Sequence, residues 1–232
     1  MSADTVACVS IDITVRGSFA VFERPERGIV HAVIGYESPE MDPVYQRLVH
    51  DLDAVTASIT TLHDPGRGPI TWWSAEQLRT WSTRPWNKDG KQLPLVHHAS
   101  VAVEVKFSDF AALSRWVGEQ IASIGGFRIS RVEWALTVKR KDALLADVRT
   151  RAVRDAVTRA QQYADALGLG AIAPTSIADA GMLVAGAYSA NASPVATLRG
   201  SSGAGFSSDV ELTPKDIEVS AAVDARFVVD RS

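Results

Sequence analysis

Small residues recur at every fourth position in the segment 147–168, DVRTRAVRDAVTRAQQYADALG, and this spacing strongly limits how the chain can fold. Because a helix turns by about 100° per residue, residues four apart lie on the same side. That side carries Val148, Ala152, Ala156, Ala160, Tyr163 and Leu167. Alanine side chains are short, so this side can lie close to a β-sheet. We predict a helix that Asp142 caps, that Gly168 ends, and that packs on a sheet.

The outer side of this predicted helix alternates in charge. Asp147, Arg151, Asp155 and Arg159 follow one another at steps of four, so every acid neighbours a base. Each such pair stabilises a helix by about 0.2–0.5 kcal/mol. A site for an anion would instead need several cations that converge on one point without carboxylates between them. The alternation therefore indicates a solvent-facing surface.

Arg149 does not fit this division, because it lies four residues after Leu145 and four before Val153, inside the apolar side. Two interpretations are open. The guanidinium extends outward past the edge of the sheet. Alternatively, Arg149 is buried in an ion pair with a carboxylate, and Glu133 and Glu104 are the candidate partners.

Both ends of the chain alternate between apolar and polar residues, which is the period of a half-buried β-strand. Near the start, Val9, Ile11, Ile13 and Val15 share one face. Near the end, Ile217, Val219, Ala221, Val223, Ala225, Phe227 and Val229 share one face, and Glu218, Ser220, Asp224 and Arg226 share the other. We therefore expect a structural strand at each end.

Two further helices and a long hairpin are predicted between these strands. Asp42 caps a helix over 42–62, and Ser108 caps a second helix that ends at the glycines 125–126. The apolar side of the second helix carries Phe110, Leu113, Val117, Ile121 and Ile124. The hairpin occupies about 70–107, with its tip at NKDGK. In the strand that follows, the alternation changes phase, which predicts a bulge near Ser130.

The order of these elements predicts an α+β fold, with one mixed, mainly antiparallel sheet, about three helices packed on one face, and a long hairpin or arm. We expect a single domain over 1–232. The segment 180–208 has Arg199 as its one charged residue, yet it contains apolar residues that pure linkers seldom carry. Met182, Leu183 and Tyr188 belong to this group. We predict an arm or hairpin here, inserted before the last strand, that orders against a second subunit.

The composition excludes several classes of protein. The net charge of −3 argues against a general binder of polyanions. The lone Cys8 excludes an intramolecular disulfide framework and a cysteine-based zinc cluster. The adjacent His97 and His98 point to opposite faces of a strand, so we expect neither a metal nor a cofactor. The first residues do not combine a basic region with an apolar one, and we expect a cytoplasmic protein without a membrane partner.

Tryptophans and basic residues concentrate in ITWWSAEQLRTWSTRPWNKDG, the most unusual local composition of the chain. The tryptophans are Trp72, Trp73, Trp81 and Trp86, and Arg84 lies among them. Adjacent Trp72 and Trp73 must point to opposite faces of a strand, so one of them leaves the main core. Three interpretations stay open: a subunit interface, packing within the hairpin, or a surface for a ligand or single-stranded nucleic acid.

Three passages resemble the SIMPL-domain family, which includes bacterial periplasmic immunogens and an adaptor associated with an interleukin-receptor kinase. They are HHASVAVEVKFSDFAALSRWVGEQIASIGGFRISRVEWAL, RAVRDAVTRAQQYADALGL and TPKDIEVSAAVDARFVV. The alanine helix of the family has the form A-v-x-D-A-x-x-x-A-x-x-x-A. Ala152, Asp155, Ala156, Ala160 and Ala164 occupy these places here. The chain departs from the family in ERPERG, where relatives usually have PD. Many relatives begin with a signal sequence, and we expect none here.

The resemblance implies a domain of unknown function with no established catalytic residues to transfer. Some relatives form ring-like or channel-like homo-oligomers, and some are linked to defence against oxidative stress. We therefore expect a non-catalytic scaffold or binding protein that self-associates and whose other protein partners are unspecified. Two other classes are kept as alternatives: a hydrolase or transferase with an unrecognised pocket, and a nucleic-acid-binding module that uses the basic segments 79–91 and 139–159, although nucleic acid is not the expected partner.

Overall fold

The computed structural model describes residues 10–88, 92–183 and 212–230, and these residues form two compact units. Unit 1 comprises the described residues 10–23, 137–183 and 216–230. Unit 2 comprises 24–88, 92–136 and 212–215. Each unit has its own sheet and its own apolar core.

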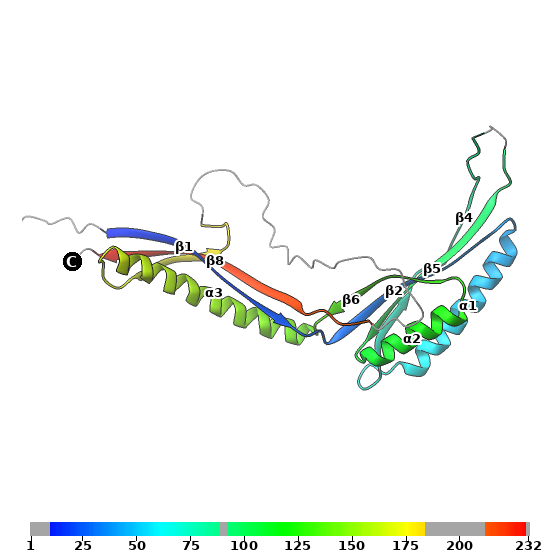
Figure 1. The fold of residues 1–232 in the computed structure, drawn as a ribbon, viewed down its shortest axis with the longest axis horizontal. Helices are drawn as coiled ribbons and strands as arrows, with labels where there is room; N and C mark the ends of the chain where they lie inside the picture. Colours follow the sequence, from blue (N-terminus) through cyan, green and yellow to red (C-terminus); the bar gives the residue numbers. More distant parts are fainter. Residues whose placement is uncertain (1–9, 89–91, 184–211, 231–232) are drawn as a thin grey trace, which may run out of the picture. The chain divides into compact units, whose positions relative to one another are not determined.

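Unit 1 is a three-stranded antiparallel sheet with one long helix on it. The sheet has the order β1 (Ser10–Glu23), β8 (Ile217–Asp230), β7 (Ala173–Asp179). The two chain ends thus pair with each other, as β1 and β8, over their full length. Helix α3 (Val138–Ala166) runs along β1 and β8 (Figure 1).

The row of small residues on α3 faces the sheet, as the sequence predicts. Val148 and the alanines at 152, 156, 160 and 164 are completely buried. The prediction is wrong for Tyr163 and Leu167, which are 53% and 65% exposed. Four residues turn a helix by about 400°, so a strict four-residue repeat rotates around the axis by about 40° per step. The row of buried residues therefore winds around the helix as it follows the twisted strands beneath it, and it does not stay on one straight side of the helix.

Gly17 of β1 is the point of closest approach between this helix and the sheet. A Cβ atom at Gly17 would come within 2.5 Å of the Ala156 backbone nitrogen, and closer still to the Ala152 carbonyl oxygen. No side chain fits into that space. The helix backbone and the strand backbone are therefore in direct contact, which explains why the facing residues are glycine and alanine.

Two charged side chains of α3 bond to the backbone of β1, which is an edge strand of its sheet. The Ser18 N–H donates to Asp155 Oδ2 at 2.9 Å, and Arg159 Nη1 donates to the Arg16 carbonyl oxygen at 2.7 Å. Both side chains also keep the predicted pairing at steps of four, with 3.9 Å between Arg159 Nη1 and Asp155 Oδ2. The charged side of the helix thus covers the edge of β1 as well as facing solvent.

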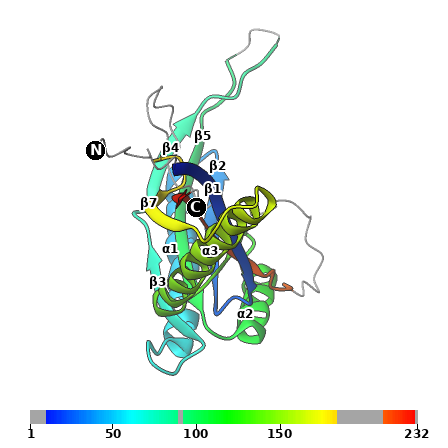
Figure 2. The same cartoon turned by 90° about the vertical axis from the view of Figure 1, so that its left-hand side faces the viewer.

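Unit 2 is a five-stranded antiparallel sheet with two helices on one face. The strands are β2 (Arg27–Ser38), β3 (Ile70–Ala75), β4 (Arg79–Thr83), β5 (Val96–Phe107) and β6 (Phe127–Ala135). Their order is β3-β5-β2-β6, and β4 pairs with β5 beyond the end of β3. Helices α1 (Met41–Leu62) and α2 (Phe110–Ser123) lie on the same face in both views (Figures 1 and 2). Their buried residues form one core with the sheet.

Several details of unit 2 confirm or correct the sequence prediction. The bulge near Ser130 is confirmed, because Arg131 pairs with His31 and Ile129 pairs with the next residue, so that Ser130 is skipped. In α2 the buried side includes Trp116, which the prediction missed, whereas Ile121 is 40% exposed. The helix caps are shifted: Glu40, Asp109 and Thr137 occupy the cap positions of α1, α2 and α3.

The predicted α+β class is confirmed, with three helices and mainly antiparallel strands among the described residues. The strands divide between two sheets, so the expectation of one sheet is wrong. The reason is that β1 pairs with the distant β8 and not with its neighbour β2. The single domain over 1–232 stays a prediction, and most of the predicted arm at 180–208 lies outside the described residues. Across the described helices, no span is sufficiently long and apolar to traverse a bilayer.

We predict that Gly17→Ala destabilises the protein by about 1–3 kcal/mol or more, because the added methyl group overpacks the contact between β1 and α3. Gly118→Ala is the matched control, since a Cβ there meets nothing within 4 Å. In the middle of α2 the control should stabilise by about 0.5–1 kcal/mol. Urea unfolding followed by circular dichroism measures both changes. Equal stability of the Gly17→Ala variant and the wild type would contradict the close contact.

Candidate functional site

The face of the unit 2 sheet that carries no helix is the candidate functional surface, and we call it the open face. Along β5 every second side chain, from Ala99 to Phe107, is buried under the helices, and the residues between them are partly exposed. These intervening positions include His98, Ala102, Glu104 and Lys106. The open face also carries His31 of β2, Glu133 of β6, Trp72 of β3 and Trp81 of β4, as their strand pairing shows.

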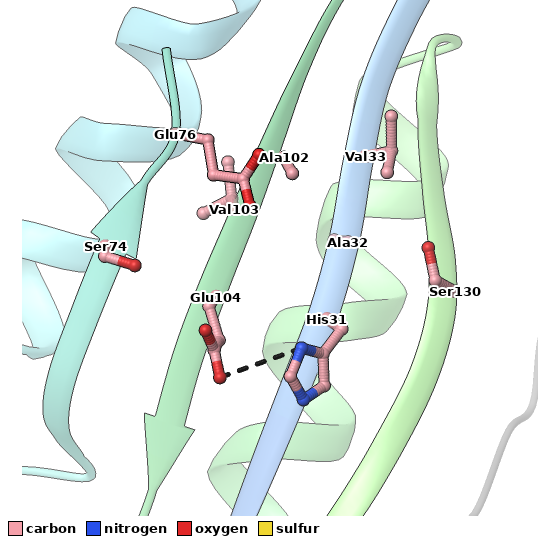
Figure 3. Close-up of a pocket in the computed structure, with 9 residues that line it drawn as sticks. All are labelled: His31, Ala32, Val33, Ser74, Glu76, Ala102, Val103, Glu104 and Ser130. Carbon is pink, nitrogen blue, oxygen red and sulfur yellow. Dashed lines mark ion pairs between the residues drawn. The ribbon is translucent and has the colours of Figure 1, made fainter.

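A shallow hollow lies on the open face around His31 (Figure 3). Its lining comes from four neighbouring segments: His31, Ala32 and Val33 of β2, Ala102, Val103 and Glu104 of β5, Ser74 and Glu76 from β3 and the residue after it, and Ser130 of β6. The β-bulge places Ser130 at the rim of the hollow. Bulges are common beside functional sites, where they interrupt the regular pairing of the strands. The hollow has a volume of about 120 Å³, so it can take a few waters or one small polar group.

His31 lies between two carboxylates. Glu104 Oε1 is 3.7 Å from its Nδ1 atom, and Glu133 Oε2 is 3.5 Å from its Nε2 atom. Both distances exceed an ordinary hydrogen bond. The buried Nε2 atom forms no hydrogen bond within the part of the chain that the structure describes. Each ring nitrogen of His31 therefore faces a carboxylate on the open face.

This arrangement decides against one of the two interpretations of Arg149, the buried ion pair. Glu104 and Glu133 were the candidate partners of a buried Arg149, but both flank His31. Arg149 lies on an exposed position of α3 in unit 1. The buried row of α3 rotates as it follows the twisted strands, so Arg149 leaves the buried side and extends toward solvent.

The hairpin formed by β4 and β5 carries an ordered aromatic cluster. The Trp81 ring stacks on the His98 ring at 5.0 Å, with 7° between their planes. Thr83 Oγ1 lies 2.8 Å from His98 Nε2, and Glu37 Oε2 of β2 lies 3.4 Å from His98 Nδ1. The imidazole is held on both sides, so Trp81 is presented in a fixed orientation although 45% of the residue is exposed. On the opposite face Ser82 Oγ lies 2.7 Å from His97 Nδ1, which links the two strands again.

The four predicted interface tryptophans have different environments. Trp72 is partly exposed on the open face, where the Lys106 ammonium lies 5.2 Å from its ring centroid. Trp73 is partly buried and packs against the core of unit 2. Trp86 lies beyond the last pair of β4 and is 84% exposed. Nearby, Arg84 Nη1 donates to the Leu93 carbonyl oxygen at 2.6 Å.

A comparison with known families matches residues 13–227 to SIMPL, described as a protein of unknown function (DUF541). The chain belongs to the SIMPL family. The match spans the strands and helices of both units, and it thus includes the α3 contact and the open face. A comparison with curated proteins finds no match.

The other predicted interface residues of this SIMPL chain lie at or beyond the end of β7. Met182 is 76% exposed and Leu183 is half-buried, while Tyr188 lies outside the described residues. The turn that leads to them is fixed by Asp224 of β8, because the Gly181 N–H donates to its carboxylate at 2.6 Å. Gly181 has a φ of 90°, which favours glycine.

Asp224 is also the buried member of an ion pair in unit 1. It lies opposite Arg16 in the pairing of β1 and β8, and Arg16 Nε donates to Asp224 Oδ1 at 2.7 Å. This hydrogen bond holds the pKa of Asp224 below its ordinary value, and it raises the pKa of Arg16. Sequence reasoning placed Asp224 on the polar face of the last strand but missed its burial, because alternation alone does not show which polar residue has a partner.

Tyr36 links three elements of unit 2. Its hydroxyl donates to Asp51 of α1 and accepts from the Gly126 N–H at 2.9 Å, just before β6. The Arg47 guanidinium lies 4.4 Å from its ring centroid. Burial raises the pKa of the Tyr36 hydroxyl, and the bond to Asp51 raises this pKa further. This group serves the packing of the helices on the sheet and lies away from the hollow.

We predict that acid destabilises unit 1 through Asp224. Because its folded pKa lies below the ordinary value of 3.8, the carboxylate stabilises the fold above that pH, and the stabilisation is lost as the pH falls toward the folded pKa. Asp224→Asn should cost about 1.5–3 kcal/mol near pH 7 and flatten the acid limb of stability against pH. Asp12→Asn, on the exposed side of β1, is the control. An unchanged acid limb in Asp224→Asn would refute this assignment.

Proposed function

We propose that this SIMPL chain is a binding module that carries out no catalysis of its own and self-associates through the free edge of β4 in unit 2. The observation that supports this proposal most directly is an exposed edge strand with an oriented tryptophan at its centre. All five residues of β4 are exposed, and Trp81 is the middle residue. Membership in the SIMPL family does not by itself give a function, so the proposal goes beyond the family assignment.

The backbone of β4 supports this proposal. In the described sheet β4 pairs with β5 alone, so its outer edge has free N–H and C=O groups. Exposed edges of this kind pair readily with another strand. If the β4 strands of two copies pair in antiparallel register around their centres, each Trp81 lies across from its symmetry mate. A two-fold contact of this kind closes on itself and gives a defined oligomer.

The orientation of Trp81 supports an interface in a second way. Aromatic residues that are already ordered lose little conformational entropy on binding, and tryptophan is enriched among the residues that dominate binding energy. His98 and its two polar contacts hold the Trp81 ring before any partner arrives. A role in stress defence, which the family resemblance implies, is part of the same proposal and rests on that resemblance alone.

We predict that Trp81→Ala lowers the solution mass measured by light scattering coupled to size exclusion, because the centre of the β4 contact is removed. A loss of about 2 kcal/mol or more per contact would raise the dissociation constant about 30-fold. The control is Tyr45→Ala, since Tyr45 of α1 is exposed to the same degree but lies on a helix. A wild-type monomer at high concentration, or unchanged mass in the Trp81→Ala variant, would refute the proposal.

A hydrolase is the second candidate, and one observation favours it. Thr83, His98 and Glu37 align a hydroxyl, an imidazole and a carboxylate in the order of a catalytic triad. The 3.4 Å between His98 and Glu37 is longer than an ordinary hydrogen bond. If the arrangement is catalytic, His98→Ala removes hydrolysis of p-nitrophenyl acetate and His97→Ala retains it. Equal rates in the two variants would exclude this triad.

A further inference from the structure

The end of the β4–β5 hairpin combines exposed apolar side chains with basic ones. We define the hairpin end as the described residues 84–88 and 92–95. Trp86 is 84% exposed, which is the highest exposure among the large apolar residues of the described chain, and Leu95 is 42% exposed. Arg84 and Lys88 are also exposed, and the sequence from 84 to 95 has three basic residues and one acid, Asp89. This local charge contrasts with the net charge of −3 of the whole chain.

We propose that the hairpin end docks onto the surface of an anionic lipid bilayer, with Trp86 and Leu95 entering the headgroup layer. Tryptophan prefers this layer because its ring is apolar while its N–H needs a polar partner. The long side chains of Arg84 and Lys88 can reach the lipid phosphates while the apolar residues insert. Because these cations are complementary in charge to anionic headgroups, an anionic bilayer is the partner that fits this surface. The inference departs from the expectation that no membrane is a partner.

The backbone of the hairpin end favours a lipid surface over another strand. Pro85 and Pro94 lack an N–H, and the regular pairing of β4 with β5 stops at Thr83 and Val96. Beyond this point Arg84 joins the two arms through the Leu93 carbonyl oxygen. The hairpin end therefore cannot extend the sheet as an edge strand does. The self-association proposed above uses β4, so the two proposals depend on different residues.

The side chains also favour lipid over nucleic acid. Stacking of bases requires aromatic faces along a continuous basic groove. The hairpin end has one tryptophan, and its remaining apolar residues are leucines and prolines, which offer no face for a base. Farther along the open face, Glu76 and Glu104 lie between Trp81 and Trp72, and their charges repel phosphates. An acyl and headgroup layer accepts leucine and proline without such a groove.

The test is sedimentation of the full chain with vesicles of three parts phosphatidylcholine to one part phosphatidylglycerol. We expect binding to these vesicles, weaker binding to phosphatidylcholine alone, and further weakening at high salt. Trp86→Ala should weaken binding about tenfold or more. Lys88→Gln should weaken it about fivefold, as expected for one cation near an anionic surface. Because both side chains are exposed, neither substitution should alter the melting of the fold, which circular dichroism checks.

The matched control is Trp72→Ala, which removes an exposed tryptophan beside a lysine elsewhere on the open face. It should leave vesicle binding unchanged. The proposal is overturned if the wild type does not sediment with the mixed vesicles, or if Trp86→Ala and Trp72→Ala bind equally well. Binding of single-stranded poly(dT), but not of vesicles, in a manner that depends on Trp86 would assign the surface to nucleic acid. A lower solution mass of Trp86→Ala with unchanged vesicle binding would assign it to self-association.

Quenching by brominated lipid provides a second readout that does not depend on the amount bound. Bromine on the acyl chain quenches tryptophans that enter the bilayer. At saturating vesicles the wild type should lose more fluorescence than Trp86→Ala, because Trp86 is the residue that inserts. Equal fractional quenching in the two proteins would overturn the proposed insertion even if the chain sediments with vesicles.

Discussion

The direct contact between the backbones of α3 and β1 is the constraint on which unit 1 depends. Gly17 leaves no space for a side chain, and the alanine row of α3 supplies the shortest side chains opposite it. Dispersion forces between atoms this close are individually small, but they add up along a helix of this length. The same closeness brings Asp155 and Arg159 within hydrogen-bonding distance of the β1 backbone. The close packing of α3 on β1 thus determines both the small residues of the core and the hydrogen bonds that cover the edge of β1.

The edge strand β1 of unit 1 and the edge strand β4 of unit 2 differ in how far side chains cover them, and this difference supports the proposed self-association. In unit 1 side chains of α3 occupy an N–H and a C=O of the edge strand β1. In unit 2 the edge strand β4 is exposed along its full length and presents an oriented tryptophan. An exposed edge strand can pair with another strand, and the proposed self-association rests on the edge of β4. The open face next to that edge also holds His31 between two carboxylates.

Local patterns made much of the secondary structure predictable. The alternation in the last strand and the four-residue repeat in α3 each identify an element and its buried face, because these periods follow from backbone geometry. The change of phase before Val132 was enough to predict the bulge at Ser130. The failures share a different cause. The sequence places Tyr163, Leu167 and Arg149 on the buried side only if a straight helix lies on a flat surface. The strands beneath α3 twist, and these residues are exposed.

The amino-acid sequence by itself determined the α+β class, the spacing of small residues on α3, the basic and aromatic composition of the hairpin, and membership in the SIMPL family. These properties are local or additive, so they can be read along the chain. The tertiary structure alone decided that β1 pairs with β8, that Glu104 and Glu133 flank His31, and that Asp224 is buried and paired with the exposed Arg16. Each of these depends on residues far apart in sequence, and a periodic pattern fixes which face a residue occupies but not which residue lies opposite it.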